Sequence, residues 1–371
     1  MDSVVVVGAG SFGASLAWWL ARAGTRVTLV DQFEPGDRRA TSGGETRLIR
    51  ASHGDGAEYT ASARRARTLW RELEQESGEA LMLECGLAWF AHAANGWEAE
   101  SERTLRAQGI PVDRLTVAEA ARLFPSFRGD DLEFVLFEPE AGGLRAQRAT
   151  QTLAARAVAH GATLERAVAR PDGERVALAD GRRLEADAVV WACGGWLSAL
   201  FPGLVSVRTT RQDLFFLDGG EAWVDAPGWV DYDGAVYGIG DIDGIGVKIA
   251  PDTEGPELPA DAELPPADPG NERWARDYAA RRFPGLAGAA LRESRTCRYE
   301  LSPDSHFVAA PHPEHPSVWL LGGGSGHGFK HGPALAEQVA DALTGRVALP
   351  DRFALGERLP GRSLRTAGSS R

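Results

Sequence analysis

Lysine is almost absent from this chain of 371 residues. Lysine and arginine together number 40, and only Lys248 and Lys330 are lysines. Because arginine stands wherever either cation would serve, we expect both lysines to occupy positions that need a compact, titratable ammonium. Cysteine is also scarce, with Cys85, Cys193 and Cys297 widely spaced. This odd number excludes a disulfide framework or a CxxC metal site and favours a reducing cytoplasm.

Long apolar runs and basic clusters are missing as well. No segment approaches the length of a membrane span, and the first residues lack the basic, apolar and small-residue order of a signal peptide. The net charge of −12 argues against nucleic acid or an anionic membrane as a partner. We therefore expect a cytoplasmic globular protein, long enough for two domains, that acts on a small molecule.

The first 31 residues carry the clearest pattern. Residues 4–7 are a β-branched run typical of a strand buried on both faces, residues 14–23 read as a helix, and residues 27–30 form a second strand. The loop Gly8-Ala9-Gly10-Ser11-Phe12-Gly13 separates the first strand from the helix. This order predicts a dinucleotide site, FAD or NAD, on the helix N-terminus.

The three glycines of this loop are each required by a different steric demand of dinucleotide binding. Gly8 permits the tight turn, Gly10 lets the backbone approach a pyrophosphate, and Gly13 lets the helix pack closely on the strand. Asp31 ends the second strand, where its carboxylate can accept hydrogen bonds from a ribose hydroxyl.

Two later strands also end in glycines. Residues 188–192 lead into Cys193-Gly194-Gly195-Trp196, and residues 318–321 lead into a glycine-rich loop over 322–330, followed by a helix from Pro333. Because this C-terminal return suits the longer FAD better than NAD, we expect an α/β fold with an FAD-binding, Rossmann-like domain of discontinuous segments. An antiparallel-sheet substrate domain is inserted between them. The expected FAD-binding segments are 1–80, 145–204 and 300–371, and the expected substrate segments are 81–144 and 205–299.

These stretches resemble the D-amino-acid-oxidase-like FAD-dependent oxidoreductases, most of all the branch of monomeric sarcosine oxidase and N-methyl-L-tryptophan oxidase. The resemblance covers nearly the whole chain. It rests on GAGSFG with Asp31, on ETRLIR at 45–50, on the segment 237–248, on Thr296-Cys297-Arg298-Tyr299, and on SGHGFK at 325–330.

The resemblance implies a role for each matching residue. Lys248 matches the lysine that activates dioxygen, and Arg47 the arginine packed on the flavin. Cys297 matches the cysteine that holds FAD covalently through a thioether. Arg50 and Lys330 match the pair that binds the substrate carboxylate.

The resemblance also implies a wider set of contacts. Tyr237 and Tyr299 match tyrosines of the substrate cavity, and Asp252 occupies a further position of that cavity. The resemblance implies no metal. The positions assigned to FAD are Gly8, Gly10, Ser11, Phe12, Gly13, Asp31, Gln32, Ser42, Gly43, Thr46, Arg47, Val168, Gly194, Trp196, Cys297, Gly324, Gly326, His327, Gly328, Phe329 and Lys330.

Three positions depart from the family pattern. Ser42 and Gly43 stand where sarcosine oxidases have a pair of histidines, and Asp252 stands where they have another histidine. An acid at that position favours a cationic substrate group or a differently shaped cavity.

We therefore expect a monomeric FAD-dependent amine oxidase. It would oxidise the C–N bond of an N-alkyl or cyclic amino acid to an imine, with O2 reduced to H2O2. The alternatives are a flavin dehydrogenase with another electron acceptor and a non-catalytic FAD-binding protein. An NAD-dependent dehydrogenase is a further alternative, which a yellow protein would exclude.

Overall fold

A computed structural model describes residues 1–367 of the chain. Its first sheet has six strands, in which five neighbouring strands run parallel and the sixth, β19, is antiparallel at one edge. In spatial order the strands are β19 (Val308–Pro311), β20 (Val318–Gly322), β13 (Ala188–Trp191), β1 (Ser3–Val7), β2 (Arg26–Asp31) and β9 (Thr163–Arg166).

The alternation of side chains along β1 explains the layers around this sheet. Val4 and Val6 pack in the core that contains helices α1 (Ser11–Arg22), α5 (Ala146–Ala159) and α8 (Gly332–Leu343). Val5 and Val7 belong to a second core on the opposite face. That face is covered by β10 (Ala169–Asp172), β11 (Arg175–Leu178), β12 (Arg183–Leu184) and α6 (Leu197–Leu200).

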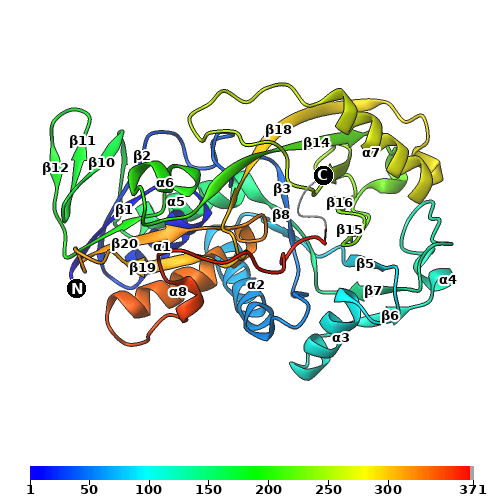
Figure 1. Ribbon diagram of the computed structural model, residues 1–371, viewed down its shortest axis with the longest axis horizontal. Coiled ribbons are helices and arrows are strands. Elements are labelled where there is room, and N and C mark those ends of the chain that lie inside the picture. Colours follow the sequence, from blue (N-terminus) through cyan, green and yellow to red (C-terminus); the bar gives the residue numbers. More distant parts are fainter. Residues whose placement is uncertain (368–371) are drawn as a thin grey trace.

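The second sheet has eight strands and occupies the other end of the molecule (Figure 1). It is antiparallel except where β15 pairs with β5. In order its strands are β18 (Leu291–Leu301), β14 (Arg208–Leu217), β17 (Val247–Pro251), β16 (Val236–Ile239), β15 (Gly228–Asp231), β5 (Leu87–Ala91), β7 (Phe134–Glu138) and β6 (Asp113–Leu115). Helix α7 (Pro269–Arg282) covers one face through an aromatic core.

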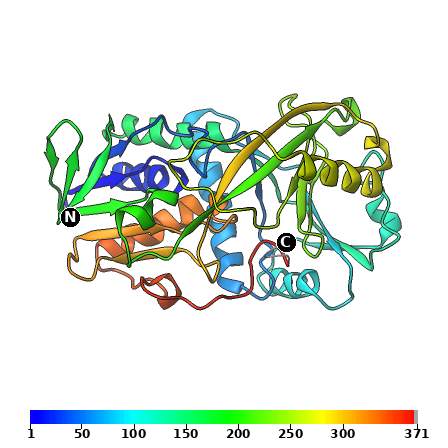
Figure 2. The same cartoon turned by 45° about the horizontal axis from the view of Figure 1, so that its top comes forward.

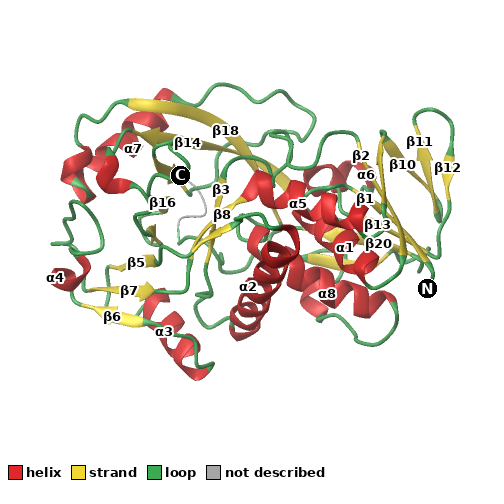
Figure 3. Cartoon of the chain, turned by 180° about the vertical axis from the view of Figure 1, so that it is seen from behind, coloured by secondary structure: helices red, strands yellow, loops and turns green. Residues whose placement is uncertain are grey.

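The two sheets are joined by a central layer. Helix α2 (Ala57–Ser77) crosses between them in Figure 2 and packs on α8. Beside it lies a small sheet of β3 (Thr46–Ile49), β8 (Gly142–Arg145) and β4 (Met82–Leu83). Seen from behind, helices α1, α2, α5 and α8 gather on one side of the six-stranded sheet, away from α3 (Trp97–Ala107) and α4 (Val117–Ala120) (Figure 3).

The α/β fold class expected from the sequence is confirmed. The first helix begins at Ser11, three residues before the expected start, because the Gly10 carbonyl already accepts a helical hydrogen bond from Ala14. The strands of the six-stranded sheet come from the segments expected for FAD, and the eight-stranded sheet uses the segments expected for substrate, apart from the end of β18. The division into two domains stays a prediction. Within residues 1–367 no helix is long and apolar enough to cross a membrane.

Candidate active site

A single cavity of about 670 Å³ runs between the two glycine-rich loops. Both loops lie at the carboxyl ends of parallel strands, which is where α/β sheets bind ligands. The predicted FAD residues that line it are Gly8, Gly10, Ser11, Phe12, Asp31, Gln32, Ser42, Arg47, Val168, Gly194, Trp196, Gly324, Gly326, Gly328 and Phe329.

The N-terminal loop has no space for a side chain at Gly8 or at Gly13. Gly8 has a φ of 105°, and a Cβ there would lie 2.4 Å from the carbonyl oxygen of Ala192. A Cβ at Gly13 would lie 1.8 Å from the carbonyl oxygen of Gly8. The close helix–strand packing expected of this motif is therefore present, and the loop leaves bare backbone facing the cavity.

Asp31 holds the loop and also faces the cavity. Its two carboxylate oxygens accept backbone N–H groups of Ala9 at 2.6 Å and Phe33 at 2.8 Å. Burial raises its pKa, although these two hydrogen bonds oppose the shift. Each oxygen keeps a further lone pair, so a ribose hydroxyl can still donate to Asp31.

Gly43 explains one departure from the family pattern. A Cβ at this position would lie 2.4 Å from the Asp37 carbonyl oxygen, so the loop 37–43 has no room for a histidine. Ser42 lines the cavity, with its Oγ 3.0 Å from where a Cβ of Gly10 would stand. The packing of loop 37–43 therefore requires glycine at position 43, and Ser42 faces the cavity.

One face of the eight-stranded sheet carries a row of predicted site residues. Lys248 on β17, and Cys297 and Tyr299 on β18, point to the same face as Phe216 of β14. Asp252 follows directly after the end of β17. Tyr237 joins them from β16, packed with Cys297 in one apolar cluster. This face is opposite to the one that α7 covers.

Lys248 is a buried cation in this row. Its Nζ donates to the Thr46 carbonyl at 3.1 Å and lies 5.1 Å from the centre of the Tyr237 ring. Burial, and secondly the charge of Arg47, lower its pKa to about 7. This pKa lies near neutral pH, and the functional role expected for Lys248 stays a prediction.

Arg47 and Cys297 stand beside Lys248. The Arg47 guanidinium is fixed by the carbonyls of Thr41 at 3.0 Å, Gly43 at 2.6 Å and Thr46 at 2.9 Å. Burial raises the pKa of the Cys297 thiol, and the charges of Arg47 and Lys248 oppose that shift. The thiol is thus held next to two fixed cations.

Arg50 and Lys330 are brought together from distant parts of the chain, and both are buried. Lys330 donates to the His327 carbonyl at 2.8 Å, and Arg50 Nη2 donates to the Leu364 carbonyl at 3.0 Å. Burial lowers the pKa of Arg50 to about 10, and burial followed by the charge of Arg50 lowers that of Lys330 well below its usual value, while the carboxylate of Glu138 opposes both shifts. A further anion beside these two side chains would stabilise their charged forms.

Asp252 is not a free acid. Its Oδ1 accepts from Tyr299 Oη at 3.0 Å and from Arg365 Nη1 at 2.8 Å. Burial raises its pKa, and the Arg365 charge is the largest opposing influence. The sequence suggested that this acid would favour a cationic substrate group, and the structure supplies that cation from the protein itself.

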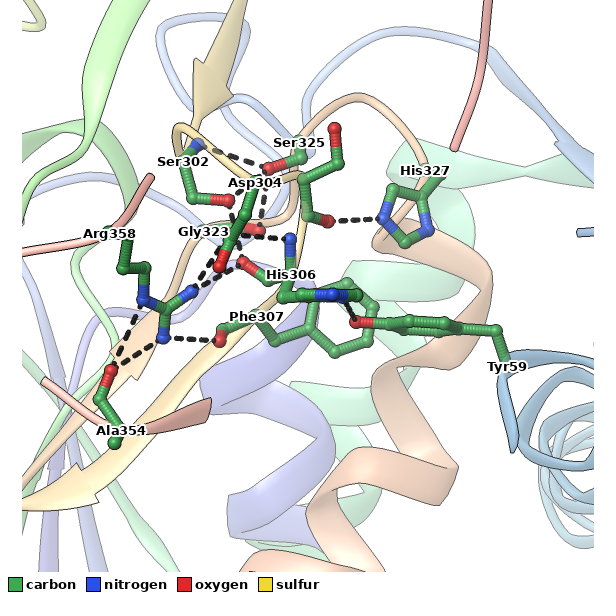
Figure 4. A network of polar contacts seen from close by, with 11 residues as sticks. Tyr59, Ser302, Asp304, His306, Phe307, Gly323, Ser325, His327, Ala354 and Arg358 are labelled. Carbon is green, nitrogen blue, oxygen red and sulfur yellow. Dashed lines mark hydrogen bonds and ion pairs between the residues drawn. The ribbon is translucent and has the colours of Figure 1, made fainter. Parts of the chain in front are cut away.

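Figure 4 shows how the C-terminal glycine-rich loop is held in place. Ser325 Oγ lies 2.8 Å from Ser302 Oγ, and His327 Nε2 lies 2.9 Å from the Ser305 carbonyl. Arg358, further along the chain, donates to the Phe307 carbonyl at 3.0 Å. This network fixes the loop that carries Lys330.

Three buried imidazoles stand beside Lys330. Ring nitrogens of His53, His327 and His331 lie within 4.8 Å of one another. Burial and then the charge of Lys330 lower all three pKa values well below their usual range. With Arg50 also close, a metal dication would meet strong repulsion here, and the expected absence of a metal stays a prediction.

Some predicted FAD residues do not line the cavity within residues 1–367: Gly13, Gly43, Thr46, Cys297, His327 and Lys330. Sequence reasoning also missed residues near the site. Glu300 lines the cavity and accepts the Gly324 N–H at 2.7 Å, and Arg365 pairs with Asp252. No motif marks either residue, since each is defined by a partner far away in the chain.

These residues fit a dinucleotide. Backbone atoms of both glycine-rich loops line the same cavity, and Asp31 at the end of β2 and Arg47 line it as well. A family model described as FAD dependent oxidoreductase matches residues 3–342. The chain therefore belongs to this family, called DAO, and is an FAD-dependent oxidoreductase. The expected family resemblance is confirmed.

Individual relatives cover nearly the whole chain. It is 30% identical over 366 residues to monomeric sarcosine oxidase of Bacillus sp. (strain B-0618), covering 92% of each chain. It is 27% identical over 352 residues to N-methyl-L-tryptophan oxidase of Yersinia pestis (strain Pestoides F), covering 91% of this chain and 93% of that one. Among solved structures, L-proline dehydrogenase from P. horikoshii superposes with a TM-score of 0.83 at 21% identity, over 95% of this chain and 97% of that one. A likeness at that identity concerns the fold alone.

Proposed function

We propose that this enzyme is an oxidase of N-alkyl or cyclic amino acids, using FAD bound in the cavity and O2 as the acceptor. The observation that carries the proposal is the pairing of two buried cation sites. Arg50 and Lys330 form one pair, and the buried Lys248 with the half-buried Arg47 forms the other. The first site suits a carboxylate and the second suits charge that develops on oxygen.

Arg50 and Lys330 would bind the substrate carboxylate. A guanidinium and an ammonium both make charge-assisted hydrogen bonds to a carboxylate, which orients the neighbouring C–N bond. Because burial disfavours the charged form of both groups, an incoming anion would stabilise their positive charges. The site therefore selects amines that carry a carboxylate.

FAD would supply the redox chemistry, taking up a hydride from the C–H bond next to nitrogen. Loss of that hydride and of the N–H proton turns the amine into an imine, and O2 would take up the two electrons with two protons to give H2O2. Lys248 would stabilise the negative charge that develops on oxygen, and Arg47 a negative charge on the cofactor. Both residues are fixed by the backbone of the segment 41–46, so the charges are held before reaction.

Cys297 is proposed as the site of a covalent link to FAD. Support comes from its position beside Arg47 and Lys248, on the sheet face that carries Tyr237 and Tyr299. Neither Cys85 nor Cys193 has a cation among the groups that act on its thiol pKa.

The purified yellow protein should be mixed with a panel of amines while peroxide release is followed. N-methyl and cyclic amino acids should give peroxide in step with substrate loss, and the matching amines without a carboxylate should react far more slowly. If substrate reduces the flavin but aerated buffer does not reoxidise it, the enzyme is a dehydrogenase. If no amine reduces the flavin, the proposal is wrong and FAD binding without turnover takes its place.

A further inference from the structure

The last described residues of the chain enter the proposed substrate site. Residues 363–367, here called the C-terminal strap, follow a stretch that leaves the six-stranded sheet and reaches the strands β15 and β16 (red in Figure 1). Leu364, Arg365 and Thr366 are buried, although they lie near the end of the chain. Burial of a terminal segment requires specific anchors, which the structure provides.

Tyr232, in the turn between β15 and β16, anchors the strap. Its Oη donates to the Ser363 carbonyl at 2.9 Å. Its own carbonyl accepts Thr366 Oγ1 at 3.2 Å and the Ala367 N–H at 3.0 Å. The strap is therefore held on both sides of Arg365.

The strap contacts Arg50, which the proposed function gives to the substrate carboxylate, and Asp252, which the family resemblance places in the substrate cavity. The Leu364 carbonyl accepts from Arg50 at 3.0 Å, and Arg365 donates to Asp252 Oδ1 at 2.8 Å. The Arg365 guanidinium also lies 4.9 Å from the centre of the Tyr299 ring. A Cβ at Gly326 would come within 2.6 Å of Arg365 Cδ, so the strap and the glycine-rich loop pack directly together.

We propose that Arg365 is a positioning residue that neutralises Asp252 and so adapts the substrate pocket to an uncharged amine. This inference rests on the proposed function. The charged and titratable groups that act on Asp252 are Arg365, Arg50, Tyr299 and Tyr237, from four separate segments. Of these, Arg365 is the one that forms an ion pair with the carboxylate.

The consequence for catalysis follows from charge. Amine oxidation requires the uncharged amine, and a lone buried carboxylate nearby would stabilise the ammonium instead. An opposite charge within ~4–6 Å raises the pKa of such a group by about 1–3. With Arg365 in place, Asp252 is part of a neutral pair and this effect is largely cancelled.

The test compares two arginines of the same C-terminal segment. Arg365→Gln removes the partner of Asp252, whereas Arg362→Gln removes an exposed arginine that pairs with Glu100. Flavin reduction by an N-methyl amino acid would be followed anaerobically from pH 6 to pH 10. The rate of flavin reduction should rise with pH as the bound amine loses its proton, and this rise is called the rising limb. In Arg365→Gln we expect the rising limb to lie about one pH unit or more higher than in the wild type. Arg362→Gln should keep the wild-type profile.

Two further variants separate charge from folding. Arg365→Lys keeps a cation and should keep the profile close to wild type. Asp252→Asn combined with Arg365→Gln removes both charges and should return the limb toward its original position. A uniform loss of rate at every pH in Arg365→Gln, with no movement of the limb, would overturn the inference. If the wild-type enzyme oxidises no amine at all, it is the proposed function that has failed.

Discussion

Replacing Lys248 with methionine should slow flavin reoxidation and at the same time stabilise the protein. The ammonium is buried, and its pKa of about 7 lies far below the ordinary 10.5. A depression of this size corresponds to a destabilisation of about 5 kcal/mol when the lysine is charged in the unfolded chain. Methionine removes that penalty, while the loss of the hydrogen bond to Thr46 leaves a carbonyl unpaired at a cost of about 1–3 kcal/mol. The expected net gain is about 2–4 kcal/mol.

The sign of the pH dependence follows from proton binding. Between pH 7 and 10.5 the unfolded chain holds a proton on Lys248 that the folded chain has released. The stability of the wild type therefore rises with pH through this window. The advantage of Lys248→Met should be largest at or below pH 7. Above about pH 10.5 the ammonium penalty is gone, so the variant should be less stable than wild type by about 1–3 kcal/mol, the cost of the lost hydrogen bond.

Two measurements check the prediction. Thermal and denaturant unfolding across the pH range report the stability difference, and stopped-flow mixing of reduced enzyme with aerated buffer reports reoxidation. Removing an electrostatic donor of this kind should slow reoxidation on the order of 10²–10³-fold. The other lysine provides the matched control, because Lys330→Met should weaken reduction by substrate and leave reoxidation nearly unchanged.

Two results would refute the reasoning. Unchanged reoxidation in Lys248→Met would remove the oxygen-activating role and favour the dehydrogenase alternative. A variant less stable than wild type at pH 7 would show that the ammonium is not destabilised by burial in the way its surroundings indicate.

Three other predictions concern the cofactor and the substrate. After acid precipitation of the wild type the yellow colour should stay with the protein. Cys297→Ser should release the colour to the supernatant, whereas Cys193→Ser should not. Flavin lost from the acid-precipitated wild type would disprove the covalent link. Arg50→Ala should raise KM for a carboxylate-bearing amine by a factor of about 10 to 150, the equivalent of a charged hydrogen bond of about 1.5–3 kcal/mol. Amines without the carboxylate should respond little, and equal losses for both would contradict the clamp. Gly8→Ala should abolish FAD retention, because its Cβ would meet the Ala192 carbonyl; a flavin content equal to wild type would show that the loop can shift.

Local patterns predicted the nucleotide loop and much of the six-stranded sheet. The run of valines in β1 must be buried on both faces, and the glycines after it follow from steric limits inside one turn. Such constraints act between neighbours in sequence, so they can be predicted without knowing the tertiary structure. The two lysines could be singled out for a similar reason, since composition alone showed that arginine had replaced lysine elsewhere.

Other features were decided only by tertiary structure. Asp252 and Arg365 are 113 residues apart, and no periodicity links a strand of the eight-stranded sheet to the end of the chain. From sequence, Asp252 is a free acid beside the amine, whereas in the fold it is half of an ion pair. Gly43 likewise reads as a missing histidine until the Asp37 carbonyl is seen to fill its space. The sequence by itself determined which cofactor loop and which cations the protein carries, and the fold decided which charges cancel, because electrostatic pairing depends on distance in space.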